Sequence, residues 1–138
     1  MSDGKIAGDE PKGKVLLVDD DQALRQLYSV ELTGQNYSVV VAGDGEEGIA
    51  KARQEKPDLV LLDIMMPKMD GVAALGKLKE DPALKDIPVI MLTNFGQENL
   101  VQQSFSLGAS DYLLKYKVTP AEMVEKVNQI ISAKPVSL

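Results

Sequence analysis

The sequence predicts an α/β fold, a doubly wound three-layer sandwich around a five-stranded parallel sheet. Five short apolar runs recur along the chain, and most are continuously apolar, as is typical of strands covered on both faces. Segments with the apolar spacing of helices alternate with these runs. Five successive β-α units indicate a parallel sheet with right-handed crossovers. Since no internal repeat or second-domain linker interrupts them, we expect one domain.

The expected elements alternate along the chain. The strands are expected near residues 14–18, 37–42, 59–63, 88–92 and 111–115. The helices are expected at 23–34, 44–55, 72–80, 94–107 and 119–133.

Local signals support each of the first four helices. The first has an apolar face and reaches Gly34, a residue type that commonly ends helices. The second opens with Asp44 and, three residues later, Glu47, which resemble a cap and its partner. The third follows a turn at 67–71, and the fourth leads to Gly108, which is suited to stop it.

The last helix has the clearest signal. Thr119 and Glu122 have the spacing of a capping box, and Pro120 stands at the first helical position, which proline favours. Five apolar residues then lie on one stripe: Met123, Val124, Val127, Ile130 and Ile131. This segment is therefore predicted as an amphipathic helix.

Composition narrows the class of function. The 138 residues suffice for one domain with a substantial core, and 44% hydrophobic and 26% charged residues are ordinary for a soluble protein. The net charge of −6 argues against a nucleic-acid footprint and against attraction to an anionic membrane. The absence of cysteine and histidine excludes disulfides, thiolate chemistry and a phosphohistidine on this chain.

The two ends of the sequence are expected to lie outside the domain. Residues 1–13, rich in Gly, Asp and Lys, are expected to form a flexible leader, and residues 134–138 a loose tail. The leader lacks the hydrophobic segment of a signal peptide, and no apolar run approaches the roughly 20 residues of a membrane span. We therefore expect a cytoplasmic protein with its domain at 14–133.

Four of the apolar runs end in polar residues suited to handling a phosphoryl group. Asp19-Asp20-Asp21 follows the first run and Asp63 ends the third, while Thr93 and Lys115 follow the fourth and fifth. The carboxyl ends of parallel strands share one edge of a sheet, where open α/β sheets bind ligands. Carboxylates, a hydroxyl and an ammonium are therefore expected to converge there.

Each of these residues also has a purely structural explanation. Acids at a helix start cap free N–H groups, and we assign Asp21 only that role. Asp63 alone would be a turn residue before Met66-Pro67, and a threonine often ends a strand to begin a turn. The case for a site depends on the group as a whole.

Several carboxylates in one crevice repel one another unless a cation neutralises them. Oxygen ligands without histidine or cysteine suit Mg²⁺, or another hard divalent cation such as Mn²⁺. A carboxylate beside such a cation can attack phosphorus and form an aspartyl phosphate, and a lysine opposite can share the stabilisation of charge. Lys115 suits that second role because it stands at a strand end rather than on a helix face.

In this order and spacing, the motifs resemble the receiver domain of bacterial two-component response regulators, over residues 14–133. The matching motifs are Val18-Asp19-Asp20, Leu62-Asp63-Ile64-Met65-Met66-Pro67 with Asp70-Gly71, Leu92-Thr93, and Gly108-Ala109-Ser110-Asp111-Tyr112-Leu113-Leu114-Lys115. The resemblance implies a flavodoxin-like fold with strand order 2-1-3-4-5. It also implies a phosphorelay signalling module that promotes its own phosphorylation and is not a turnover enzyme.

The resemblance implies which residues bind the phosphoryl group and the metal. Asp63 would be the phosphoacceptor, taking its phosphoryl group from a histidine kinase or a histidine phosphotransfer protein. Asp19, Asp20 and Asp63 would bind Mg²⁺ together with the backbone carbonyl of Met65.

The resemblance also implies a switch and a signalling surface. Thr93 would bond a phosphoryl oxygen, Lys115 would pair with the phosphoryl group, and Tyr112 would change rotamer on activation. A downstream protein effector would bind the surface of the fourth helix, fifth strand and fifth helix, at about 97–107, 111–115 and 119–133. The chain would act as a monomer or as a phosphorylation-dependent dimer, with no nucleic-acid or membrane partner.

Three features depart from the family pattern. Tyr116 replaces the proline, often in a cis peptide, that usually follows the lysine, which predicts a trans or strained loop because a non-proline cis bond costs roughly 2.5–4 kcal/mol. Asn94 follows Thr93 where a small residue is usual, and it is expected to narrow access to the phosphoryl group. Met65 and Phe95 flank the site and cannot orient a hydrolytic water, which predicts slow self-dephosphorylation.

Two other functions are compatible with parts of the sequence. A small phosphatase of the haloacid-dehalogenase type also uses an aspartyl phosphate, and Asp19-Asp20-Asp21 contains its D-x-D element. The chain is short for that fold, however, and Ala23 stands where threonine or valine is usual. The other alternative is a receiver-like scaffold that is not phosphorylated, against which the intact acids, threonine and lysine argue. Phosphoryl label on Asp63 indicates the receiver and label on Asp19 the phosphatase.

Overall fold

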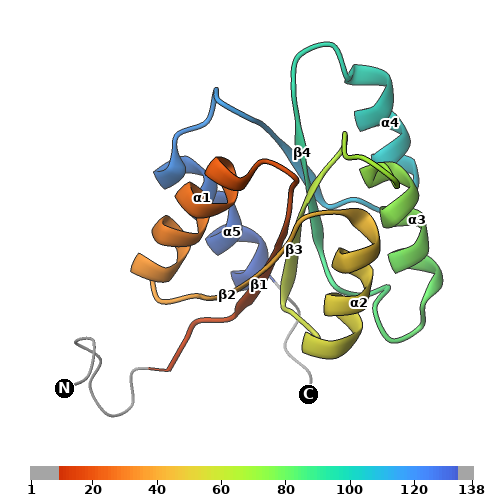
Figure 1. Ribbon diagram of the computed structural model, residues 1–138. Coiled ribbons are helices and arrows are strands. Elements are labelled where there is room, and N and C mark those ends of the chain that lie inside the picture. Colours follow the sequence, from red (N-terminus) through yellow and green to blue (C-terminus); the bar gives the residue numbers. More distant parts are fainter. Residues whose placement is uncertain (1–9, 134–138) are drawn as a thin grey trace.

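The computed structural model describes residues 10–133, in which five strands alternate with five helices (Figure 1). The elements are β1 Lys14–Val18, α1 Gln22–Gly34, β2 Ser38–Ala42, α2 Gly45–Glu55, β3 Leu59–Asp63, α3 Gly71–Glu80, β4 Val89–Thr93, α4 Glu98–Ser106, β5 Asp111–Leu114 and α5 Pro120–Ser132. The strands form one parallel sheet in the order β2-β1-β3-β4-β5. The predicted fold class and strand order are therefore confirmed.

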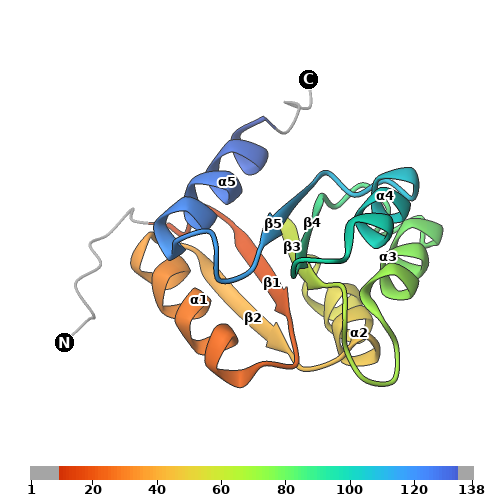
Figure 2. The ribbon, with the colours of Figure 1, turned by 90° about the horizontal axis from the view of Figure 1, so that it is seen from above.

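Helices cover both faces of the sheet. Seen from above, α1 and α5 lie on one side, and α2, α3 and α4 lie on the other (Figure 2). Neighbouring residues of a strand point to opposite faces, so Leu16 and Val18 join the core beneath α2 and α3, while Val15 and Leu17 join the core beneath α1 and α5. Each fully buried aliphatic side chain stabilises the fold by about 1.5–3 kcal/mol. This double burial explains why the strands are continuously apolar.

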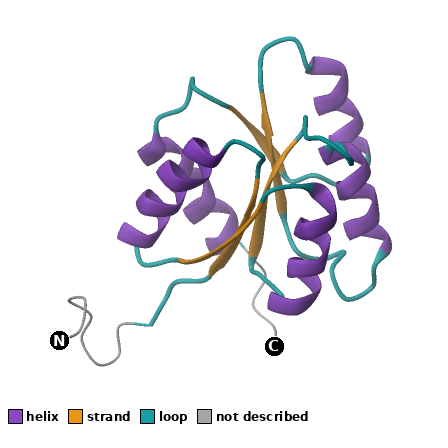
Figure 3. Cartoon of the chain, viewed as in Figure 1, coloured by secondary structure: helices purple, strands orange, loops and turns teal. Residues whose placement is uncertain are grey.

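Side-chain caps set most helix starts. The carboxylates of Asp21, Asp44 and Asp70 accept hydrogen bonds from first-turn N–H groups of α1, α2 and α3. The predicted capping box of Thr119 and Glu122 is present at α5. These caps place the loops after β1, β2 and β3 close to the strand ends, and Figure 3 shows the loops after β1, β3, β4 and β5 at the upper end of the sheet.

Element boundaries differ from the sequence-based expectation mainly at α4. That helix was expected to begin at residue 94 but begins at Glu98, because a turn containing Gly96, with φ +87°, separates it from β4. The predicted stop at Gly108 is consistent with its φ of +106° two residues after α4 ends. Residues 94–97 therefore form a turn between β4 and α4 instead of the first turn of the helix.

The expected leader and tail fall largely outside the described residues, which begin at 10 and end at 133. Near the end of the expected leader, the backbone N–H of Lys12 donates a hydrogen bond of 2.8 Å to the carbonyl of Asn36. Within the described part of the chain, no helix combines the length and apolar character needed to cross a bilayer.

Candidate functional site

Three aspartates meet at the carboxyl edge of the sheet. β1 and β3 are neighbours in the sheet, with Val18 paired to Leu62, so the residues that follow these two partners come close together. Carboxylate oxygens of Asp19, Asp20 and Asp63 lie within 4.8 Å of one another. Asp19 and Asp63 are buried, at 0% and 2% exposure, whereas Asp20 is exposed. The predicted convergence of these acids is therefore observed.

Lys115, which directly follows β5, neutralises part of this charge. Its Nζ lies 2.7 Å from Asp19 Oδ2 and 2.9 Å from Asp63 Oδ1, and the side chain is buried. Its backbone N–H bonds the Thr93 carbonyl at 2.8 Å, which extends the β4–β5 pairing by one residue and sets the position of the side chain. Burial alone would lower the pKa of Lys115, but its bonds to the two carboxylates outweigh burial and raise that pKa.

Asp63 has the most perturbed carboxyl group of the site. Burial, and then the nearby charge of Asp19, raise the pKa of Asp63 to about 7, against the opposing effects of Lys115 and of the Met65 N–H. Asp63 Oδ1 is held by Lys115 and by the Met65 N–H at 3.3 Å. Asp63 Oδ2 is buried and has no hydrogen-bond partner among the described residues.

The donor set suits a hard divalent cation. When all three are ionised, three carboxylates against one ammonium leave an excess of two negative charges, and the available atoms are oxygens rather than nitrogen or sulfur. The buried Oδ2 of Asp63 is a polar atom that a cation would satisfy. Met65 follows within two residues of Asp63, so its backbone also lies beside the cluster.

The Asp19 loop is held from two directions. Asp19 Oδ1 accepts the backbone N–H of Asp21 at 2.9 Å, and the Asp19 carbonyl accepts a 2.6 Å hydrogen bond from Arg25 Nη1 on α1. Sequence reasoning missed Arg25. The signal was a basic residue one helical turn after the capping aspartate.

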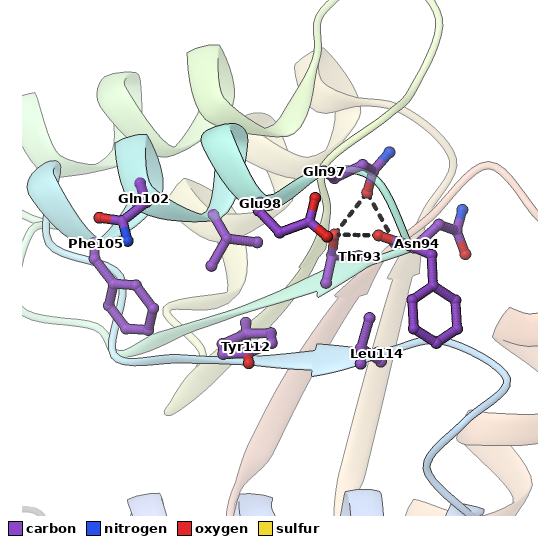
Figure 4. A pocket seen from close by; sticks show the side chains of 10 residues that line it. Thr93, Asn94, Gln97, Glu98, Gln102, Phe105, Tyr112 and Leu114 are labelled. Carbon is purple, nitrogen blue, oxygen red and sulfur yellow. Dashed lines mark hydrogen bonds between the residues drawn. The ribbon is translucent and has the colours of Figure 1, made fainter.

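Thr93 lies at the end of β4, next to β3, and is buried at 2% exposure. Its hydroxyl donates a 2.6 Å hydrogen bond to Gln97 Oε1, which also accepts the Asn94 N–H at 2.8 Å (Figure 4). Sequence reasoning did not identify the contact of Gln97 with Thr93. The helix was expected to begin at residue 94, so Gln97 was expected within the helix rather than in the turn that precedes it.

Tyr112 lines a cavity that begins at Thr93. This cavity, of about 330 Å³, lies between α4 and β5, and Figure 4 shows Thr93 at one end and Phe105 at the other. Tyr112 is half exposed, and its ring packs edge-on against Phe105 with centroids 6.1 Å apart. The two residues predicted as a switch therefore share one cavity.

Tyr116 connects two loops at the site. Its backbone is left-handed, with φ +62°, and the described peptide bonds are all trans. The loop that was expected to be trans or strained is therefore trans, with strain in the φ angle of Tyr116. Its hydroxyl donates to the carboxylate of Asp21, and this hydrogen bond, followed by the Leu24 N–H, lowers the pKa of Asp21. Asp21 was expected only to cap α1, and it also anchors the loop that carries Lys115.

Comparison with known proteins agrees with this architecture. The sequence model described as the response regulator receiver domain matches residues 15–128. The chain belongs to this family. The resemblance deduced from the motifs is thus confirmed, and the protein is a receiver domain of two-component response regulators.

The receiver domain is similar to two longer regulators and to a solved structure. RpaA of Synechocystis sp., named a DNA-binding dual master transcriptional regulator, is 42% identical over 118 residues, which cover 86% of this chain and 48% of RpaA. PhoP of Bacillus subtilis, named a transcriptional regulatory protein of alkaline phosphatase synthesis, is 37% identical over the same shares of the two chains. The chemotaxis protein CheY4 of Vibrio cholerae superposes with a TM-score of 0.79 at 31% identity, covering 85% of this chain and 97% of CheY4.

This chain spans about half the length of the curated relatives it matches. Receiver domains belong to signalling proteins and generally bind Mg²⁺ through an acidic pocket, and this chain carries such a cluster of aspartates. Family membership favours the receiver over the haloacid-dehalogenase-type phosphatase among the functions that the sequence left open.

Proposed function

We propose that this receiver domain accepts a phosphoryl group on Asp63 from the phosphohistidine of a histidine kinase or a histidine phosphotransfer protein. The observation that carries this proposal is the buried Oδ2 of Asp63, which has no hydrogen-bond partner in the described part of the chain. In the transfer, this oxygen forms a bond to phosphorus while the P–N bond of the donor breaks. The donor imidazole leaves with the electron pair of that bond and takes up a proton.

The contacts of the three acids distinguish their roles. Asp19 Oδ1 accepts the Asp21 N–H, and Asp19 Oδ2, which has no hydrogen bond, lies in a 2.7 Å ion pair with Lys115, so Asp19 is a poor nucleophile. Asp20 is exposed, which suits a ligand that shares a cation with water. Of the three acids, only Asp63 combines burial with an oxygen, Oδ2, that has neither a hydrogen bond nor an ion pair within the described residues.

Asp19, Asp20, Asp63 and the backbone carbonyl of Met65 are the groups proposed to hold Mg²⁺, or Mn²⁺ in its place. When bound, the cation supplies positive charge that offsets the charge of the phosphoryl oxygens. Lys115, whose Nζ lies 2.9 Å from Asp63 Oδ1, supplies a second positive charge.

We further propose that the signal leaves through α4, β5 and α5. Thr93 donates a hydrogen bond from its hydroxyl to a phosphoryl oxygen, Lys115 pairs with the phosphoryl group, and Tyr112 changes rotamer at the cavity that it shares with Thr93. The exposed rings of Phe105 and Tyr112 provide apolar area for a protein effector. For the receiver domain itself, a charge of −6 favours a protein partner over nucleic acid or an anionic membrane, although RpaA, of which this chain covers 48%, is named DNA-binding.

The remaining expectations form part of the same proposal. The functional unit comprises residues 14–133, located in the cytoplasm, and acts as a monomer or as a phosphorylation-dependent dimer. Met65 and Phe95, which are both exposed and apolar, flank the phosphoryl group and leave it long-lived because neither side chain orients a water by hydrogen bonding.

Incubation with acetyl phosphate and Mg²⁺, followed by mass spectrometry of the intact protein and of its peptides, tests the proposal. Wild type should gain one phosphoryl group at Asp63, and Asp63→Asn should gain none. Label on Asp19 would instead indicate the phosphatase chemistry. Failure of the wild type to bind Mg²⁺ and to gain a phosphoryl group would leave the scaffold as the function.

A further inference from the structure

Gln97 occupies the N-cap position of α4, but its side chain serves another purpose. Within the described residues it makes no capping hydrogen bond to the helix. Its Oε1 turns back toward β4 and accepts both the Thr93 hydroxyl, at 2.6 Å, and the Asn94 N–H, at 2.8 Å (Figure 4). One amide oxygen therefore closes the turn between β4 and α4 and binds the hydroxyl of Thr93.

This contact competes with the role proposed for Thr93. A hydroxyl has one proton to donate, and the shorter of the two acceptor contacts of the Thr93 hydroxyl is the one to Gln97 Oε1, at 2.6 Å, against 3.1 Å to the Asn94 carbonyl oxygen. A phosphoryl oxygen on Asp63 would need the same proton. Because Thr93 is 2% exposed, bulk water cannot readily replace the lost partner.

We propose that Gln97 is a latch: a positioning residue that holds Thr93 in the arrangement of the unphosphorylated domain and must release it when Asp63 is phosphorylated. This inference rests on the proposed function, since it requires a phosphoryl group at Asp63. The free energy needed to break the Gln97–Thr93 hydrogen bond then offsets part of the free energy gained when Thr93 contacts the phosphoryl group.

Release of the latch also explains how α4 would respond. Gln97 joins the end of β4 to the start of α4, and further along this helix Val101 and Phe105 line the cavity that contains Tyr112. When Oε1 loses Thr93, one of the two hydrogen bonds that it accepts across this turn is gone. The turn can then shift together with the cavity wall.

The probe for the test is beryllium fluoride with Mg²⁺, a phosphoryl analogue that binds a carboxylate without a lasting covalent label. Gln97→Ala removes the competing acceptor, and Gln97→Glu replaces it with a charged acceptor that bonds Thr93 more strongly. Gln102→Ala is the matched control, since it truncates a glutamine on the same helix and cavity that lies away from Thr93 (Figure 4).

A net hydrogen bond contributes about 0.5–1.5 kcal/mol, so Gln97→Ala should bind the analogue roughly 2- to 12-fold more tightly than wild type. Gln97→Glu should bind more weakly than wild type, and Gln102→Ala should match it. Titrations followed by amide NMR spectra give the affinities and also show whether each variant is folded.

A double-mutant cycle separates the latch from a general effect on the loop. In a Thr93→Val background, which has no hydroxyl to hold, Gln97→Ala should leave the affinity unchanged. An unchanged affinity of Gln97→Ala in the wild-type background, or an equal gain in the valine background, would overturn the latch. If wild type does not bind the analogue, or if Asp63→Asn binds it equally well, the proposed function itself fails.

Discussion

Gly71 begins α3 directly behind the main chain of Asp63, and this close approach leaves no room for a side chain. A Cβ at position 71 would lie 2.0 Å from the Asp63 carbonyl oxygen and 2.8 Å from the Asp63 carbonyl carbon. The Gly71 N–H also donates a 2.7 Å hydrogen bond to the Ile64 carbonyl, which keeps the two segments together. Because the clashing atoms belong to the backbone, Gly71→Ala must move the turn that carries Asp63 by more than about 1 Å.

The cost of this substitution follows from its geometry. Overpacking a buried position costs typically about 1–3 kcal/mol, and a clash with main chain lies at the upper end of that range, so we expect a loss of about 3 kcal/mol in the free energy of unfolding. Gly76→Ala is the matched control in the same helix, since a Cβ there meets nothing within 4 Å among the described residues. The same chemical change should stabilise the protein at this position by roughly 0.5–1 kcal/mol, because alanine favours a helix interior.

Urea unfolding followed by far-ultraviolet circular dichroism measures both variants against wild type. The free energy of unfolding should be lower than that of wild type for Gly71→Ala and higher for Gly76→Ala. The two variants should therefore differ from each other by about 4 kcal/mol. At low denaturant, where Gly71→Ala is still folded, it should also incorporate less phosphoryl label, because the clash displaces Asp63. A Gly71→Ala protein within experimental error of wild type would refute the close approach.

Further predictions concern the charged site and its loops. With a chelator present, Asp63→Asn should raise the free energy of unfolding by about 1–2 kcal/mol in thermal or urea melts, because it removes a buried carboxylate that Asp19 repels and leaves Lys115 paired with Asp19. Added Mg²⁺ should stabilise wild type but not the variant. Lys115→Met should cost about 3–5 kcal/mol in the same assay, since it leaves buried carboxylates unpaired; a loss below 1 kcal/mol would contradict the buried ion pairs. Tyr116→Phe should lower the free energy of unfolding by no more than about 1 kcal/mol, because the hydrogen bond of Tyr116 to Asp21 is near the surface. It should also lower the rate of labelling by acetyl phosphate, because the loop that carries Lys115 becomes looser. Phosphoryl label on Asp63 should decay over minutes or longer and several-fold faster in Met65→Asn, whose amide can orient water; decay of the wild-type label within seconds would exclude this explanation.

The fold and the acidic cluster were predictable because they depend on local sequence patterns, namely apolar runs and the polar residues that end them. The three central strands, β1, β3 and β4, are buried on two faces, so their apolar runs are uninterrupted, and each polar residue that ends such a run must lie at the same edge of a parallel sheet. The pairing of Val18 with Leu62 then brings Asp19 to Asp63 without any further information.

The contacts that sequence reasoning missed depend on turns and rotamers. Gln97 reaches Thr93 only because α4 starts at Glu98 and the preceding turn contains Gly96 with a positive φ, whereas a helix from residue 94 would have pointed the glutamine elsewhere. The bond between Tyr116 and Asp21 joins residues 95 positions apart, and no local pattern indicates it. Such contacts follow from tertiary geometry rather than from periodicity.

The charges of the site connect the proposed phosphorylation to the proposed latch. Lys115 is shared between Asp19 and Asp63 at nearly equal distances, so it cannot move fully toward a phosphoryl group without leaving Asp19. A divalent cation held by the acids would relieve that constraint by balancing Asp19, which frees the ammonium to pair with the phosphoryl group. A phosphoryl group adds negative charge and oxygen acceptors beside β4, where the buried Thr93 hydroxyl is held by Gln97. The proposed switch would therefore require two releases, of Lys115 from Asp19 and of Thr93 from Gln97, and only the second involves a residue at the start of α4.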